Sequence, residues 1–177
     1  ETEEMKTIPF LRYYRVFEIN TQVEGLKSKY IQPIGHNPIE EAEQIIEGYI
    51  DKPIIKEGSA AYYVPSKDEV YVPNIKTFYK SEEYYKVLFH ELTHSTGHKQ
   101  RLNRPGITCQ SAAFGSEEYS KEELIAELGA SFLASEAGLN YSIENTAAYL
   151  LGWLQVLKND SKLIIQAASA AEKASDF

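Results

Sequence analysis

The sequence predicts an α+β domain whose first half contains the strands and whose second half is all helical. Segments rich in aromatic and β-branched residues, typical of strands, lie in the first half. After residue 80, apolar residues recur at helical spacing between good capping residues. A chain of 177 residues, 43% of them hydrophobic, can bury one core without disulfide staples. We therefore predict a single domain over residues 1–177, without an internal repeat or a long linker.

The first elements are a strand and a helix. Residues 13–19 (YYRVFEI) have the composition of a strand. Asn37 is a good N-cap, Pro38 suits the first helical position and Glu40 completes a capping box. This pattern predicts a helix from Asn37 to about Tyr49, which ends before Pro53.

A hairpin is predicted next, over residues 60–73. Two short strand-like runs flank a polar turn in this segment. Pro65 and Pro73 cannot donate to a strand ladder, so they place the hairpin at the edge of a sheet.

The second half contains four predicted helices. Ser81 caps the first, which begins with Glu82 and Glu83 and stops at Gly97. The second starts at Ser116 or Ser120 and runs to Gly138. The last two cover residues 142–157, with the single Trp153, and a segment that starts at Asp160 or Ser161 and ends near Ser175. Tyr84, Tyr85 and Trp153 are expected to pack in the core.

Charge and composition exclude several classes of protein. With 18 Lys+Arg against 26 Asp+Glu, the net charge of −8 argues against a general binder of phosphate backbones. Lys99, Arg101 and Arg104 lie close together, but we interpret them as a solvated helix end and loop. No apolar run reaches the roughly 18 residues that a membrane span needs. Cys109, the only cysteine, cannot form an intramolecular disulfide and indicates a reducing compartment.

The chemistry is expected at residues 90–94, His-Glu-Leu-Thr-His. Residues four apart share one face of a helix, so His90 and His94 can bind one tetrahedral metal ion, with zinc as the default. Glu91 lies beside them, where it can accept a proton from a water that the ion activates. The sequence therefore predicts a metal site with Glu91 as general base.

Zinc hydrolases normally take a third protein ligand. One pattern places a histidine ten residues after the first, but Gln100 stands there. His98 lies two helical turns from His90, which favours helix-end capping or a hydrogen bond to a ligand over a ligand role. His36 is interpreted as a surface loop residue.

The other pattern takes a carboxylate from the next helix, where Glu123 and Glu127 are four residues apart. One can bind the ion while the other orients a ligand histidine. A capping box from Ser120 would occupy Glu123 and leave Glu127 as the ligand, whereas a helix that begins at Ser116 leaves Glu123 free. We favour Glu123 as the ligand and interpret Glu122 as a solvated helix residue.

These residues belong to a set of motifs that extends over almost the whole chain. They are residues 90–98 (HELTHSTGH) with 101–104 (RLNR), 114–130 (FGSEEYSKEELIAELGA), 14–26 (YRVFEINTQVEGL), 147–154 (AAYLLGWL) and 167–171 (AASAA). Together they resemble the zincin-like metallopeptidase domain of ArdC-type antirestriction proteins, which occur on plasmids, phages and other mobile elements of bacteria. The resemblance implies a gluzincin-type fold, in which a small edge-exposed sheet precedes the metal helix and a carboxylate-bearing helix.

The resemblance also implies site residues and partners. His90, His94 and Glu123 would hold one Zn²⁺ or another divalent transition metal, Glu91 would be the general base, and Glu127 would hydrogen-bond a ligand. Full-length members carry an N-terminal domain that binds single-stranded DNA. We therefore expect this chain to be the C-terminal part of a longer protein of the bacterial cytoplasm that contacts DNA through the other domain and touches no membrane.

Two further residue assignments concern the substrate, and the first follows from zincins in general. The strand before the metal helix pairs with an extended peptide, which would make Val70, Tyr71 and Val72 the binding strand; the alternative is a plain edge strand blunted by prolines. Tyr119, just before the carboxylate helix, can donate to an oxyanion.

Two functions stay open. The first is a zinc-dependent metallopeptidase that cleaves an unidentified protein or peptide. The second is a non-proteolytic metal-binding module that helps a DNA-binding antirestriction protein shield incoming DNA from restriction enzymes. Intact His90, Glu91 and His94 favour the first, because a binding module needs no general base. The antirestriction role of the family that the chain resembles favours the second.

Overall fold

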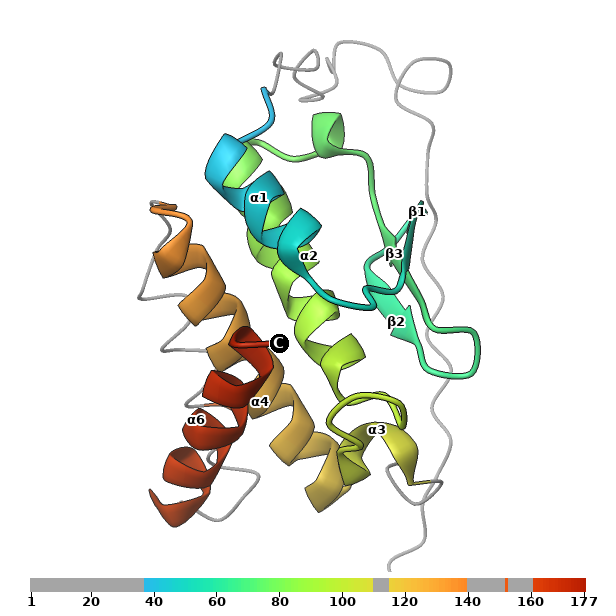
Figure 1. The fold of residues 1–177 in the computed structure, drawn as a ribbon, viewed down its shortest axis with the longest axis vertical. Coiled ribbons are helices and arrows are strands. Elements are labelled where there is room, and N and C mark those ends of the chain that lie inside the picture. The colour runs from blue at the N-terminus through green and yellow to red at the C-terminus, as the bar shows by residue number, and fades with distance from the viewer. Residues whose placement is uncertain (1–36, 110–114, 140–151, 153–160) are drawn as a thin grey trace, which may run out of the picture. The chain divides into compact units, whose positions relative to one another are not determined.

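The computed structural model describes residues 37–109, 115–139, 152 and 161–177 (Figure 1). By its contacts the chain divides after Gln32, and all the described residues belong to the unit Pro33–Phe177. The predicted strand at 13–19, the predicted helix at 142–157 with Trp153, and His36 lie outside the described residues. Within them the α+β class is confirmed, whereas the single domain over residues 1–177 stays a prediction.

The order of elements places a small sheet before the long helices. The helices and strands are α1 (Glu40–Gly48), β1 (Ile54–Glu57), β2 (Tyr62–Val64), β3 (Glu69–Val72), the 3-10 helix η1 (Ile75–Thr77), α2 (Ser81–Thr96), α3 (Pro105–Thr108), α4 (Glu117–Glu136) and α6 (Ser161–Ser175). Helix α2 contacts β2 and β3 as well as α4, and α6 packs along α4 (Figure 1). None of the described helices is long and apolar enough to span a membrane.

The sheet has the order β1–β3–β2 among the described residues, with β1 parallel and β2 antiparallel to β3. The hairpin is confirmed, but the prediction that Val70–Val72 lie at a sheet edge is wrong. Both sides of β3 are paired, because β1, which the sequence did not reveal, lies against its other side. Pro65 and Pro73 follow β2 and β3 directly, so they end these strands without marking an edge. In the described part of the chain, β2 is the edge strand beside α2.

The predicted capping box at the start of α1 does not form. The N-cap is Ile39, which has no side-chain cap, and the helix begins at Glu40. The Asn37 carbonyl instead accepts a hydrogen bond from the Ser81 hydroxyl, and the Ile39 N–H donates to the Tyr85 hydroxyl. Contacts with the start of α2 therefore hold this segment in place of a local cap. The prediction that Ser81 caps the next helix is also wrong: Ser81 is the first residue of α2, and the N-cap is Lys80, which makes no side-chain cap hydrogen bond.

The core lies where α1, β3 and α4 surround α2. Its fully buried large side chains include Tyr85, Leu88 and Phe89 of α2 and Val70 of β3. Tyr84 packs edge-on against Tyr85, so the predicted core role of both tyrosines is confirmed.

The start of α4 follows the first of the two predicted alternatives. Ser116 is the N-cap, and its hydroxyl accepts the Tyr119 N–H at 3.1 Å. The Ser120 hydroxyl donates to the Ser116 carbonyl, so it does not form a capping box. Glu123 therefore lies in the second turn of α4, outside the cap, and its carboxylate faces the histidines of α2.

Helix α4 approaches α2 closely at a glycine. A Cβ on Gly129 would lie 2.5 Å from the Thr93 methyl carbon, so no larger residue fits there unless one helix shifts or the Thr93 side chain rotates. This contact fixes how near the glutamates of α4 come to the histidines of α2.

Candidate metal centre

Three side chains from α2 and α4 converge on one point. His90 and His94 stand one turn apart, and their Nε2 atoms are 3.1 Å from each other. Each Nε2 lies 3.6 Å from a carboxylate oxygen of Glu123. One ligand atom from each of the three residues lies within 4.8 Å of the other two. The structure thus brings together the residues predicted to hold the ion.

The donor set fits a divalent ion. Two ligand atoms about 2.1 Å from one ion at the tetrahedral angle are roughly 3.4 Å apart. The observed separations of 3.1 and 3.6 Å lie on either side of this value. Two imidazoles and one carboxylate are also the ligand types of catalytic zinc sites with an open fourth position.

Each histidine ring also contacts a carboxylate through its Nδ1 atom, on the side away from Glu123. Glu127 lies 3.5 Å from Nδ1 of His90, and Glu122 lies 3.2 Å from Nδ1 of His94. An Nδ1–H that donates to a carboxylate leaves the Nε2 lone pair for an ion. Both rings therefore present Nε2 toward Glu123.

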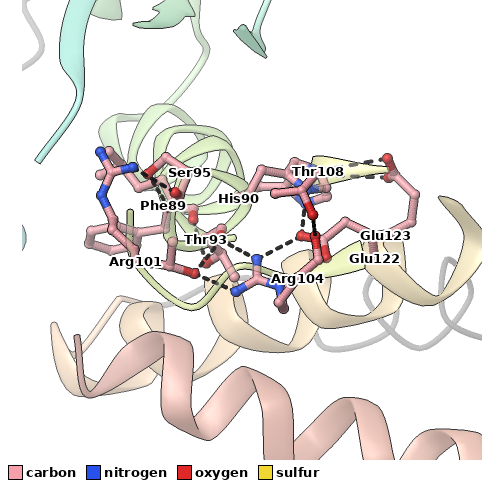
Figure 2. Close-up of polar contacts among 12 residues, drawn as sticks. Phe89, His90, Thr93, Ser95, Arg101, Arg104, Thr108, Glu122 and Glu123 are labelled. Atoms are coloured by element: carbon pink, nitrogen blue, oxygen red, sulfur yellow. Dashed lines mark hydrogen bonds and ion pairs between the residues drawn. The ribbon is translucent and has the colours of Figure 1, made fainter. Parts of the chain in front are cut away.

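A cation in turn holds each of these carboxylates. Lys86 pairs with Glu127 at 2.9 Å. Arg104 makes a bidentate pair with Glu122 at 2.6 and 2.9 Å, which Figure 2 shows. Burial alone raises the pKa of both glutamates. The hydrogen bonds from Arg104 and His94 to Glu122, and from His90 and Lys86 to Glu127, outweigh burial and lower the pKa of each carboxyl.

Glu122 and the arginines differ from what the sequence predicted. Glu122 is 3% exposed rather than solvated. Arg104 is also buried, and the Arg101 side chain pairs with Asp68 and is 3% exposed, so the interpretation of this segment as a solvated loop is wrong. The reason is that each arginine pairs with a carboxylate distant in sequence, which offsets the cost of burying its charge.

The electrostatics of the centre favour a cation. Burial lowers the pKa of His90, but the hydrogen bonds to Glu123 and Glu127 and the charge of Glu91 outweigh it and raise the pKa to about 9. The buried carboxylates of the described residues all lie at this site: Glu91, Glu122, Glu123 and Glu127. Lys86 and Arg104 supply two positive charges against these four negative ones, which leaves −2 when both histidines are neutral, as they would be as ligands of an ion. A divalent ion balances that charge.

Glu91 points into a cavity of about 460 Å³ beside the two histidines. Burial raises the pKa of its carboxyl, and the Tyr63 backbone N–H donates to it. The cavity is lined by residues of β2, of α3 and its C-cap, and of α4; these include Tyr62, Tyr63, Ile107, Cys109, Tyr119 and Glu123. A buried base with a raised pKa next to a cluster of ligands is the arrangement expected of a hydrolytic site.

Other predicted residues lie around this cavity or away from it. Burial and a hydrogen bond to Glu123 raise the pKa of the Tyr119 hydroxyl, so this group donates to the carboxylate. The His98 ring accepts the Gln100 N–H at 3.4 Å at the end of α2, and His98 does not join the metal cluster. Val70–Val72 are separated from the cavity by β2, whose Tyr62 and Tyr63 line it.

The sequence missed Glu122, Arg104, Lys86 and β2 as parts of the site. Glu122 could have been suspected because it adjoins Glu123, the predicted ligand, on the side of the helix that has to face α2. For Arg104, no local pattern separates a buried arginine from a solvated one.

A helix with the HExxH motif, whose histidines meet a glutamate from a following helix beside a small sheet, defines a zincin-like domain. The sequence model of the zincin-like metallopeptidase family, MPTase-PolyVal, matches residues 40–170, and the chain belongs to this family.

Solved structures support the fold. The chain is similar to the antirestriction protein ArdC of plasmid R388 in its Mn(II)-bound structure, with 36% identity and a TM-score of 0.63 over 88% of this chain and 57% of ArdC. The metal-free structure of ArdC matches with 35% identity and a TM-score of 0.59 over 99% of this chain and 62% of ArdC.

Curated relatives are longer proteins. The DNA primase TraC of Escherichia coli is 35% identical over 156 residues, which are 88% of this chain and 14% of TraC. The uncharacterised protein y4eC of Sinorhizobium fredii is 36% identical over 95% of this chain and 53% of its own length. The chain thus spans about half or less of the curated relatives it matches.

Proposed function

We propose that this domain is a zinc-dependent peptidase that hydrolyses a peptide bond. The observation that carries the proposal is the placement of Glu91, a buried base, in the same cavity as the converging His90, His94 and Glu123. A domain that kept an ion for structure alone would have no use for such a base.

In this proposal His90, His94 and Glu123 bind the ion, and Glu127 and Glu122 orient the two rings. When bound, a divalent ion polarises the scissile carbonyl and lowers the pKa of a water. Glu91 accepts the proton of the attacking water and then donates it to the leaving amine. The raised pKa of Glu91 suits both transfers. Zinc is the proposed ion, and the Mn(II) in ArdC makes manganese the first competitor to test.

We propose that the peptide substrate binds along β2, and not along residues 70–72 as the sequence predicted. Tyr62 and Tyr63 line the cavity, and the Tyr63 N–H that reaches Glu91 sets the strand directly beside the base. Among the described residues β2 pairs only with β3, so its other side is open to an extended peptide. Tyr119 is proposed to leave Glu123 and donate to the carbonyl oxygen during attack.

The first test is metal content together with hydrolysis. We expect about one zinc per chain after loading, lost in His94→Ala and Glu123→Ala and retained in Glu127→Ala. The zinc-loaded protein should cleave members of a quenched-fluorescent peptide library. Glu91→Gln should keep the zinc and the fold but lose cleavage, since only the base is removed.

Two outcomes would overturn parts of the proposal. Loss of zinc in Glu127→Ala with Glu123→Ala unaffected would reverse the ligand assignment. Equal cleavage by the wild type and Glu91→Gln would exclude Glu91 as the base. If Glu91→Gln also left an antirestriction effect unchanged, the domain would act there as a metal-binding module without proteolysis.

The biological setting is proposed from the relatives. ArdC is named as an antirestriction protein and TraC as a DNA primase, which points to a role on plasmid DNA in the bacterial cytoplasm. Because this chain has a net charge of −8, we propose that single-stranded DNA is bound by another domain of a longer protein and not by this one.

A further inference from the structure

Two arginines of the loop between α2 and α3 make the same kinds of contact with the C-terminal end of α2. Arg101 makes a bidentate pair with Asp68 and donates to the Ser95 carbonyl at 2.9 Å. Arg104 makes a bidentate pair with Glu122 and donates to the Thr93 carbonyl at 2.7 Å. Figure 2 shows the two guanidinium groups on different sides of the helix end. Only the Arg104 pair continues to a histidine of the metal site, because Glu122 contacts Nδ1 of His94.

The loop between α2 and α3 fixes where Arg104 lies. Its backbone folds back on the helix end: the Leu102 N–H donates to the Thr96 carbonyl, and the Arg104 N–H donates to the Gly97 carbonyl. The guanidinium also donates to the Thr96 hydroxyl. The backbone and the guanidinium of Arg104 are therefore both tied to the C-terminal end of α2, and its bidentate contact fixes the Glu122 carboxylate in one orientation.

Gly97 makes room for this arrangement. Its backbone is right-handed, with φ of −74°, so another residue would not be strained there by its dihedral angles. A Cβ, however, would lie 3.0 Å from an Arg104 guanidinium nitrogen and 2.6 Å from the Ile107 side chain. The glycine is thus required by the close approach of Arg104 and α3 to the end of α2.

We propose that Arg104 is a positioning residue for the metal site: through Glu122 it holds the His94 ring with Nε2 turned toward His90 and Glu123. The inference rests on the proposed function in one respect, that His94 binds the ion. Glu127 does the corresponding work for His90, but its cation is Lys86, a single point charge on a side chain that is 21% exposed. Arg104 supplies a planar fork from a buried position, which restrains the carboxylate more tightly.

The test compares Arg104→Met with Arg101→Met. Both variants lose a buried arginine of the same loop that is paired with a carboxylate and bonded to a carbonyl of α2. Three quantities are measured: the free energy of unfolding in excess chelator, the Zn²⁺ affinity by competition with a chromophoric chelator, and the visible spectrum of the Co²⁺-loaded protein. The spectrum reports ligand geometry, which a loss of stability alone does not change.

We expect Arg104→Met to weaken Zn²⁺ binding by about 10- to 100-fold and to change the Co²⁺ spectrum. Arg101→Met should lose stability but keep the Zn²⁺ affinity within about twofold and the Co²⁺ spectrum unchanged. Glu122→Gln should resemble Arg104→Met, and Arg104→Lys should recover part of the affinity, because lysine restores the charge without the fork. Gly97→Ala should also weaken binding, since its Cβ would press on both the Ile107 side chain and the intact guanidinium.

If Arg104→Met lost stability but kept both the affinity and the spectrum, Arg104 would be structural only and the proposal would be wrong. Should Arg104→Met fail to fold, Arg104→Lys and Glu122→Gln decide the question with the same readouts, and wild-type behaviour in both would refute it. Failure of the proposed function looks different. A wild-type protein that binds no ion would remove the metal site itself, whereas zinc binding without peptidase activity would leave this inference intact.

Discussion

Gly129→Ala should loosen the contact on which the metal site depends. The new Cβ would lie 2.5 Å from the Thr93 methyl carbon and 2.8 Å from its hydroxyl oxygen. Carbon atoms prefer separations of about 3.5–4.0 Å, so α2 and α4 must part by about 1 Å or Thr93 must rotate. Rotation would break the hydrogen bond from the Thr93 hydroxyl to the Phe89 carbonyl.

The expected loss of stability is about 1–3 kcal/mol. Overpacking costs roughly 1–3 kcal/mol and the lost hydrogen bond about 1 kcal/mol, while alanine returns about 1 kcal/mol of helix propensity. For a domain of this size the melting temperature falls by about 2–4 °C per kcal/mol. A separation of about 1 Å also exceeds the roughly 0.5 Å that a preorganised site tolerates, so Zn²⁺ affinity should fall by at least about tenfold.

The assay is thermal unfolding followed by circular dichroism, with and without zinc. Gly48→Ala is the matched control, because a Cβ there meets nothing within 4 Å, and its melting temperature should stay the same or rise. Thr93→Ala removes the two closest atoms, so the double variant Gly129→Ala/Thr93→Ala should regain much of the zinc affinity. A Gly129→Ala protein that is more stable than the wild type and binds zinc equally well would refute the reasoning.

Three other changes test separate parts of the structure. Zinc at a free concentration of 1,000 times its dissociation constant should stabilise the protein by about 4 kcal/mol, and a chelator should remove this stabilisation. The melting temperature should fall on adding the chelator and recover with excess zinc. An unchanged melting temperature would argue against a bound ion. Asp68→Asn keeps a residue tolerant of the observed φ of +53° but unpairs Arg101, so the free energy of unfolding in urea should fall by up to about 3 kcal/mol with zinc affinity unchanged. Ser116→Ala should cost about 1 kcal/mol in the same urea experiment, and no loss would contradict its role as the cap of α4.

Local patterns predicted the long helices and the two histidines well. Helix α6 covers Ser161–Ser175, where the sequence places a helix from Asp160 or Ser161 to near Ser175, and α2 ends one residue before Gly97. The relation of His90 to His94 depends only on helical spacing, which tertiary contacts do not alter. The sequence could not decide between Ser116 and Ser120 as the cap of α4, because serine is an acceptable cap at either position.

Non-local pairing explains what the sequence did not reveal. The place of β3 in the sheet depends on β1, a strand of four residues with one half-buried side chain and no alternating pattern. The capping box at Asn37 was lost to contacts with Ser81 and Tyr85, more than 40 residues away. In each case a contact between distant segments decides between local alternatives that are nearly equal in energy.

The glutamates of α4 show why the site was only partly visible. Glu122, Glu123 and Glu127 lie on the buried side of the helix together with alanines, while Phe132 is 38% exposed. A helix that buries carboxylates has no clear apolar face, so the usual signal of the core-facing side is missing. Such burial is costly unless each charge is balanced, and here Lys86 and Arg104 balance two of the carboxylates of the site. The two negative charges that remain on the carboxylates would be neutralised by a divalent ion. Metal binding and the stability of the α2–α4 contact should therefore rise and fall together.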